Sequence, residues 1–203
     1  MALTTGIKVA SEDILKKGGL RAIYLTEYSN LASVAITSGQ ADVALTSAKA
    51  YAFQFELETA NWSFTATSER GSTLVEHTIE FYVPNMQKAN FEELKEILNV
   101  PIVAICEENN VDSSKGKAWL VGYSETYSSI TSSGSAAAFN DQDQMYAMIS
   151  SIEGSTGSAF SDTIGCTVRI TARSGDLPYL VPAGDITRGS TELAGNYMTF
   201  PTS

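Results

Sequence analysis

The chain has 203 residues, of which 43% are hydrophobic, and a formal net charge of −10. This length suits a single domain that buries enough surface to fold without disulfide bonds. Non-specific nucleic-acid binding depends on Lys and Arg side chains that neutralise phosphates, so an acidic chain without a basic run is a poor candidate for it. No apolar run approaches the roughly 18 residues of a membrane span, and the first residues do not resemble a signal peptide.

The first third of the chain predicts strands and little helix. Residues 11–17 predict one helical turn, which the two glycines that follow would stop. The segment 51–58 alternates apolar with polar residues, which is the period of a strand with one buried face. The strands predicted in this part are 21–28, 32–37, 42–46, 51–58 and 62–67, and a polar turn is predicted at 69–72.

The segment 74–127 has the clearest pattern in the chain. Apolar residues at every second position predict a strand over 74–83, which Pro84 ends because it has no N–H to donate. An amphipathic helix follows, and Pro101 ends it. The apolar stripe of this helix is Phe91, Leu94, Ile97 and Leu98, and strands are predicted at 102–106 and 118–123 around a polar turn at 107–117.

The last third combines polar loops with two further strands. Residues 128–138 are rich in Ser, Ala and Gly, which predicts either a mobile loop or an extended segment that becomes ordered against a partner. A strand is predicted at 145–153, with a helix as the alternative, and another at 166–171. The tail after residue 177 contains prolines and little periodicity, which predicts an arm.

These elements define the expected fold class. About eight strands and one clear helix, with turns at short intervals, predict a mainly β (β+α) protein. We expect two packed antiparallel β-sheets that form a sandwich or barrel, with one flanking α-helix and extended loops or arms.

Residues able to carry chemistry are few. His77 is the single histidine and lies on the alternating face of a predicted strand, so we expect a packed structural role rather than a general base. Cys106 and Cys166 lie in separate predicted strands and are expected to be buried thiols, while a disulfide would require those strands to be neighbours. Two cysteines and one histidine are too few for a metal site of the usual kind.

The remaining motifs are partial. Ser124 lies in half of a nucleophile elbow, but Thr126 stands where the second glycine belongs. Residues 140–143 begin like a calcium loop but lack its glycine and distant glutamate, and the carboxylates Glu107, Glu108 and Asp112 are expected on a solvated turn. We therefore predict no catalytic, cofactor-binding or metal site and no cofactor. The enzymatic alternative is a hydrolase that uses Ser124 or a carboxylate pair.

The order and spacing of these segments, rather than one motif, resemble those of phage tail tube proteins, the major tail structural proteins of phages and prophages of Bacteroidetes-type bacteria. The resemblance covers roughly residues 18–173. It rests on a Gly-Gly entry into a first strand at 18–25, a first hairpin formed by 51–56 and 62–65, a strand–helix–strand centre from 75–81 to 103–109, the strand 119–123, and the Ser/Gly/Ala stretch that ends at Asp141.

The resemblance implies one domain over 1–203, with an N-terminal arm at about 1–20 and a C-terminal arm at about 176–203. It implies a structural protein of the virion tail, made in the bacterial host cytoplasm, whose homo-oligomeric rings of six stack into a tube. DNA would pass through the lumen without specific binding, other phage tail proteins would be partners, and no membrane would be involved. The alternative is another virion assembly protein, such as a head–tail connector, baseplate or fibre-attachment component. The candidate inter-subunit loop is Ser132, Ser133, Gly134, Ser135, Ala136, Ala137 and Ala138.

Overall fold

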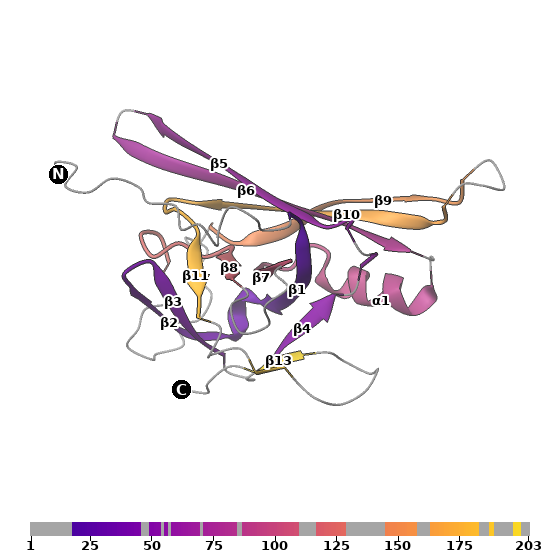
Figure 1. Ribbon diagram of the computed structural model, residues 1–203, viewed down its shortest axis with the longest axis horizontal. Coiled ribbons are helices and arrows are strands. Elements are labelled where there is room, and N and C mark those ends of the chain that lie inside the picture. Colours follow the sequence, from indigo (N-terminus) through magenta and orange to yellow (C-terminus); the bar gives the residue numbers. More distant parts are fainter. Residues whose placement is uncertain are drawn as a thin grey trace.

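The structure is a computed structural model, and its strands and short helix are shown in Figure 1. It describes residues 18–45, 49–53, 55–56, 58–69, 71–84, 87–109, 117–128, 145–157, 163–182, 187–188 and 197–199. The elements are β1 (Leu20–Glu27), the 3-10 helix η2 (Tyr28–Asn30), β2 (Leu31–Thr37), β3 (Gln40–Leu45), β4 (Lys49–Phe53), β5 (Asn61–Glu69), β6 (Ser72–Pro84), α1 (Lys88–Ile97), β7 (Ile102–Glu108), β8 (Ala118–Val121), β9 (Ala147–Ser155), β10 (Gly165–Ser174), β11 (Tyr179–Val181), β12 (Thr187–Arg188) and β13 (Tyr197–Thr199).

The strands form one large mixed sheet with two limbs, and this sheet is not closed into a barrel. The four-stranded limb has the order β5-β6-β10-β9, and the long limb has the order β12-β13-β4-β1-β7-β8-β11-β3-β2. Figure 1 shows the four-stranded limb as one layer above the long limb, with the β5–β6 hairpin extending beyond it. The mainly β class with one short helix is therefore confirmed, but the strands do not form two separate antiparallel sheets.

Two features of the pairing make the sheet continuous and mixed. The limbs join where Ile102 of β7 pairs with Ala147 of β9. The pairing of β11 with β3, through Leu180 and Gln40, is parallel, because β11 returns from the four-stranded limb to insert between β8 and β3. Neither long-range pairing leaves a signal in the local residue pattern, which explains why a division into two sheets was expected.

Gly122 allows the two limbs to approach each other at this junction. Its backbone has φ +89°, which L side chains rarely adopt. A Cβ atom at this position would lie 2.7 Å from the backbone nitrogen of Ala147 and 3.0 Å from the carbonyl oxygen of Ile102. The absence of a side chain therefore lets β9 lie against the end of β8 and cross onto β7.

Two hydrophobic cores lie on opposite faces of the central strands. The first core lies between the limbs and contains Ile79 and Phe81 of β6, Val168 and Ile170 of β10, and Ile102 of β7. The second core lies on the other face of β1, β7 and β8, beneath the β2–β3 hairpin, and contains Tyr28, Leu31, Val43, Val103 and Ile105. Helix α1 contributes Leu94 to the first core.

Most of the predicted elements are confirmed, but two predictions of the 51–67 region are wrong. The predicted strand at 51–58 ends at Phe53, since Glu58 has φ +65° and the Thr59 N–H donates to the Glu56 carbonyl in a turn. The expected hairpin between 51–56 and 62–65 does not form, because β4 pairs with β1 and β13 whereas β5 pairs with β6. The chain crosses from the long limb to the four-stranded limb between these strands.

The predicted helix is confirmed as α1, but its apolar stripe is only partly buried. Leu94 is buried and Ile97 is half-buried, whereas Phe91 and Leu98 are exposed. The helix ends at Ile97, before Pro101, and Asn99 adopts φ +72° in the turn that follows. A left-handed residue of this kind ends helices by reversing the chain, and Asn is one of the residues that tolerate it.

Several predictions fall outside the described residues. These are the helical turn at 11–17, the candidate inter-subunit loop Ser132–Ala138, and most of the two predicted arms. Within the range predicted as the C-terminal arm, Tyr179–Val181 lies in the sheet as β11.

Candidate assembly surface

The four-stranded limb has one buried face and one polar face. Along β6, buried and less buried side chains alternate from Val75 to Pro84, and along β10 they alternate from Val168 to Ser174. The buried residues face the first core. Most side chains of the opposite face in β6 and β10 are polar or charged, which is the pattern of a sheet with one face in water. They include Glu76, Thr78, Glu80, Thr167, Arg169, Thr171 and Arg173.

Cross-strand ion pairs join β6 and β10 on this polar face. The guanidinium of Arg169 donates to one oxygen of Glu80, with Nε at 3.0 Å and Nη2 at 2.6 Å from Oε2. The Nε of Arg173 lies 3.3 Å from Oε1 of Glu76. The hydrogen bond and the charge of Glu80 raise the pKa of Arg169, so this side chain stays cationic.

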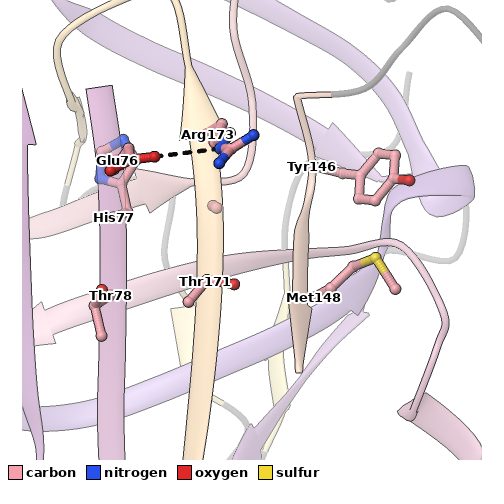
Figure 2. Close-up of a pocket in the computed structure, with 8 residues that line it drawn as sticks. Glu76, His77, Thr78, Tyr146, Met148, Thr171 and Arg173 are labelled. Atoms are coloured by element: carbon pink, nitrogen blue, oxygen red, sulfur yellow. Dashed lines mark ion pairs between the residues drawn. The ribbon is translucent and has the colours of Figure 1, made fainter. Parts of the chain in front are cut away.

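A shallow hollow lies beside the second ion pair. Its volume is about 370 Å³, and Figure 2 shows Arg173 turned toward Glu76 on one side of it, with Tyr146 and Met148 on the other. The remaining lining residues are His77, Thr78, Thr171 and Ala172. Among its lining residues, Arg173 is the cation and Glu76 is the carboxylate already paired with it.

Both edges of the four-stranded limb are open among the strands that the structure describes. Strand β5 pairs with β6 over its whole length, from Asn61 to Glu69, and with no other described strand. Strand β9 pairs with β10, but it meets β7 only at Ala147, so its other edge is open from Met148 to Ser155. Unpaired edges present backbone N–H and C=O groups that can pair with another chain.

Over residues 61–68, the open edge of β5 has none of the side chains that usually protect such an edge. Residues 61–68 include neither a charged residue nor a proline, and the side chains are exposed except for the half-buried Trp62. Lysine, proline and irregular pairing are the common means by which proteins keep strand edges from associating. A long and regular edge without them is suited to association.

His77 of β6 lies in a cluster of aromatic rings on the buried face of the β5–β6 hairpin. Its ring stacks on Trp62 with a centroid distance of 6.2 Å and an interplanar angle of 9°, and Trp62 in turn lies 5.6 Å from Trp119 of the long limb. The side chain is 3% exposed, and burial lowers its pKa to about 4. The expectation of a packed histidine is thus confirmed, because a buried neutral imidazole among aromatic rings supports packing between the limbs.

Ser124 is held by a carboxylate rather than by an imidazole. It is completely buried, and its Oγ donates to Oδ2 of Asp176 at 2.6 Å. The same carboxylate accepts hydrogen bonds from the backbone N–H and the Oγ1 of Thr126, at 3.1 and 2.7 Å. Burial alone would raise the pKa of Asp176, but the hydrogen bonds from Ser124, Thr126 and Tyr179 outweigh it, and the net effect is a lowered pKa. This arrangement fastens the segment after β8 to the β10–β11 turn.

A second cavity, of about 660 Å³, lies in the long limb beside α1. Tyr51 and Phe53 of β4 line it with Glu27, Glu93 and Glu96. It combines an apolar wall with carboxylates, and the Oγ of Ser29, another lining residue, donates to Oε2 of Glu27 at 3.1 Å.

The cysteines and the predicted turn carboxylates are placed by the strands. Cys106 and Cys166 are free, buried thiols in the first core, and burial raises the pKa of both. Glu107 and Glu108 belong to β7 rather than to a solvated turn, because the strand extends beyond residue 106. Glu107 is buried, and Glu108 accepts a hydrogen bond of 2.6 Å from Trp119 Nε1. Asp112 and residues 140–143 lie outside the described residues.

The described part of the chain has neither a cluster suited to a metal ion nor a helix suited to a membrane. Within it, no group of three or more His, Cys, Asp or Glu side chains is placed to hold a metal ion. Over the same residues, no helix has the length and apolar character needed to cross a membrane.

The sequence spacing of the ion-paired residues is a signal for these pairs. Glu76 and Glu80 are four residues apart, as are Arg169 and Arg173, which places each pair on one face of its strand with matched spacing. The contact between Ser124 and Asp176 left no such signal, since the two residues are 52 positions apart and lie in irregular segments. Comparison of the chain with protein-family models, with curated protein sequences and with solved structures finds no match.

Proposed function

We propose that this protein is a virion structural protein that self-assembles into stacked rings and forms a phage tail tube through which DNA passes. The observation that carries this proposal is the four-stranded limb with two open edges. Strands β5, β6, β10 and β9 are successively antiparallel, so β5 and β9 run in opposite directions. The β9 edge of one copy beside the β5 edge of the next would therefore continue the antiparallel pattern.

A repeated contact of this kind is head-to-tail, because it uses different surfaces on the two partners. Such contacts close into a ring when a whole number of identical rotations from one copy to the next makes a full turn. In a closed ring the four-stranded limbs become one continuous inner sheet without edges, and the long limb forms a second layer outside it. The two layers that the limbs form in one copy (Figure 1) would then continue around the ring. We propose six copies per ring, as the resemblance to phage tail tube proteins implies.

The polar face of the limb suits the wall of a water-filled bore. Its threonines and paired charges are hydrophilic, and each described arginine on it has a carboxylate partner. DNA would pass without specific binding. Other phage tail proteins would contact the ends of the tube, no membrane would take part, and the protein would be made in the host cytoplasm before it enters the virion. Residues Ser132–Ala138 remain the proposed contact between copies.

Electron microscopy of the concentrated protein tests this proposal directly. We expect rings or hollow rods from the wild type. The variant Thr65→Lys/Thr67→Lys places two charges on the open strand β5 and should prevent ring formation, because lysine on an edge strand opposes pairing. The matched control Thr167→Lys/Thr171→Lys adds the same charge to the central strand β10, where no neighbouring copy pairs, and should still assemble.

The outcomes separate this proposal from its alternatives. A wild type that stays monomeric at every concentration, or a β5 variant that assembles as well as its β10 control, would contradict it. Rings that never stack would instead indicate another assembly role, such as a head–tail connector, baseplate or fibre-attachment component. We propose that the protein is not an enzyme, since Ser124 is completely buried and bound to Asp176 rather than to His77.

A further inference from the structure

The arginines and glutamates of the polar face are in register across two strands. Arg169 pairs with Glu80 and Arg173 pairs with Glu76 in the antiparallel ladder of β10 and β6. Both cations therefore have a carboxylate directly opposite on the same face, at the closest position that a sheet provides. The open face also carries Glu153 of β9, whose charge acts on Arg169.

The geometry of these pairs occupies the groups that would bind a phosphate. A guanidinium recognises phosphate through its planar fork of N–H donors, which is the reason for the prevalence of arginine at nucleic-acid surfaces. In Arg169 the fork closes on Glu80, with Nε and Nη2 at 3.0 and 2.6 Å from the same oxygen. In Arg173 the Nε faces Glu76 at 3.3 Å. A phosphate that approaches Arg169 would have to compete with Glu80 for Nε and Nη2, and at Arg173 the charge of Glu76 beside Nε opposes it.

We infer that Glu76 and Glu80 keep Arg173 and Arg169 from binding DNA phosphates, so that a duplex can move past this face without being held. The inference rests on the proposed function, because it takes the polar face as the lumen wall. The partner is the phosphate backbone of double-stranded DNA, and the two glutamates are the residues that determine how weakly the face binds it. Without them, the same face would present two cations four residues apart on one strand, and Glu153 would be a remaining carboxylate whose charge acts on Arg169.

Fluorescence anisotropy with a short labelled DNA duplex tests the inference on the full-length protein. The variant Glu76→Gln/Glu80→Gln keeps the side-chain size and removes the negative charge directly opposite both arginines. We expect it to bind the duplex, with affinity falling roughly tenfold between about 50 and 200 mM salt, since each phosphate neutralised contributes about 0.9 to the salt exponent. The wild type should show no binding. The matched control Glu93→Gln/Glu96→Gln removes the same charge from α1 and should also show none.

Further variants assign the binding to the arginines. Adding Arg169→Gln/Arg173→Gln to the glutamate variant should abolish the gain. If Glu76→Gln/Glu80→Gln does not fold, the single variant Glu80→Gln removes the carboxylate of one pair. Its binding to the duplex should then have about half the salt exponent. Binding by the wild type, or equal behaviour of the glutamate variants and the α1 control, would overturn the inference. These results do not depend on ring formation, which microscopy reports separately, so the failure of this inference and of the proposed function can be distinguished.

Discussion

The two limbs of the sheet differ in how many of their faces are buried. In β7 of the long limb, six consecutive residues from Ile102 to Glu107 are buried. Ile102, Ala104 and Cys106 face the first core, whereas Val103 and Ile105 face the second. In β6 of the four-stranded limb, only every second residue from Val75 to Val83 is buried. One strand is enclosed between two cores, and the other separates a core from water.

This difference bears on which limb we propose as the assembly surface. A strand buried on both faces has a continuous apolar sequence. Its neighbours on both sides already pair with its backbone N–H and C=O groups. A limb with one polar face and open edges still has surface and hydrogen-bonding groups available to a partner. The candidate assembly surface therefore lies in the part of the molecule where residues alternate.

Alanine substitutions along β6 and β7 test this comparison, and they should have the largest effects on stability. Ile102 and Ile105 lie on opposite faces of β7. Ile102→Ala and Ile105→Ala should each reduce the free energy of unfolding by about 2–5 kcal/mol, because each substitution leaves a cavity in a core. In β6, Ile79→Ala should cost about as much, whereas Thr78→Ala should cost no more than about 0.5 kcal/mol. Urea unfolding measures these values, and a uniform response along β6 would contradict the assignment of its faces.

The junction of the limbs should be nearly as sensitive. Gly122→Ala would introduce a Cβ 2.7 Å from the Ala147 nitrogen at φ +89°, and we expect a loss of about 2–4 kcal/mol from backbone strain and overpacking together. Gly39→Ala is a matched control, since Gly39 has φ +80° and nothing lies within 4 Å of its Cβ position. The difference between the two variants in thermal unfolding measures the close approach, and equal losses would argue against it.

The local pattern predicted most of the secondary structure but little of the pairing. Alternation located β6 and β10, and the helical spacing before Pro101 located α1, because these signals depend on neighbouring residues. The mixed sheet could not be predicted in this way. It depends on the contact of Ile102 with Ala147 and on the insertion of β11 beside β3, which join segments far apart in the chain.

The candidate surface was predictable in part for the same reason. The matched spacing of the glutamates in β6 and the arginines in β10 places them on one face of each strand, but the register that pairs them depends on how the strands align. Strand β5 has an open edge because β6 is its one partner among the described strands. The residue pattern instead predicted a hairpin between this strand and residues 51–56. Composition identified residues without charge, and only topology showed that they lie at an edge.

Acidification should weaken the contact between the limbs at His77. Burial lowers the pKa of His77 from 6.5 to about 4, so the folded state disfavours the protonated form. The stability that this neutral imidazole contributes is complete above pH 6.5 and is lost as the pH falls toward 4. Between pH 7 and about pH 4.5 the wild type should lose about 2–3 kcal/mol through this group. Urea unfolding of His77→Leu over the same range is the comparison, and an unchanged pH dependence would exclude this role.

Asp176 should contribute a smaller amount at the second connection between the limbs, where β10 leads into β11. Asp176→Asn keeps the shape of the side chain but removes the charge that accepts hydrogen bonds from Ser124 and Thr126, so we expect a loss of about 1–2 kcal/mol at neutral pH. The pKa of Asp176 is lowered, so its contribution is complete above the ordinary value of 3.8 and is lost as the pH falls below it. This window lies below that of His77, which allows the two connections to be measured separately in one titration of stability against pH. Asp42→Asn, at an exposed position of β3, is the control. If both variants unfold alike, the second connection between the limbs depends on strand pairing rather than on this carboxylate.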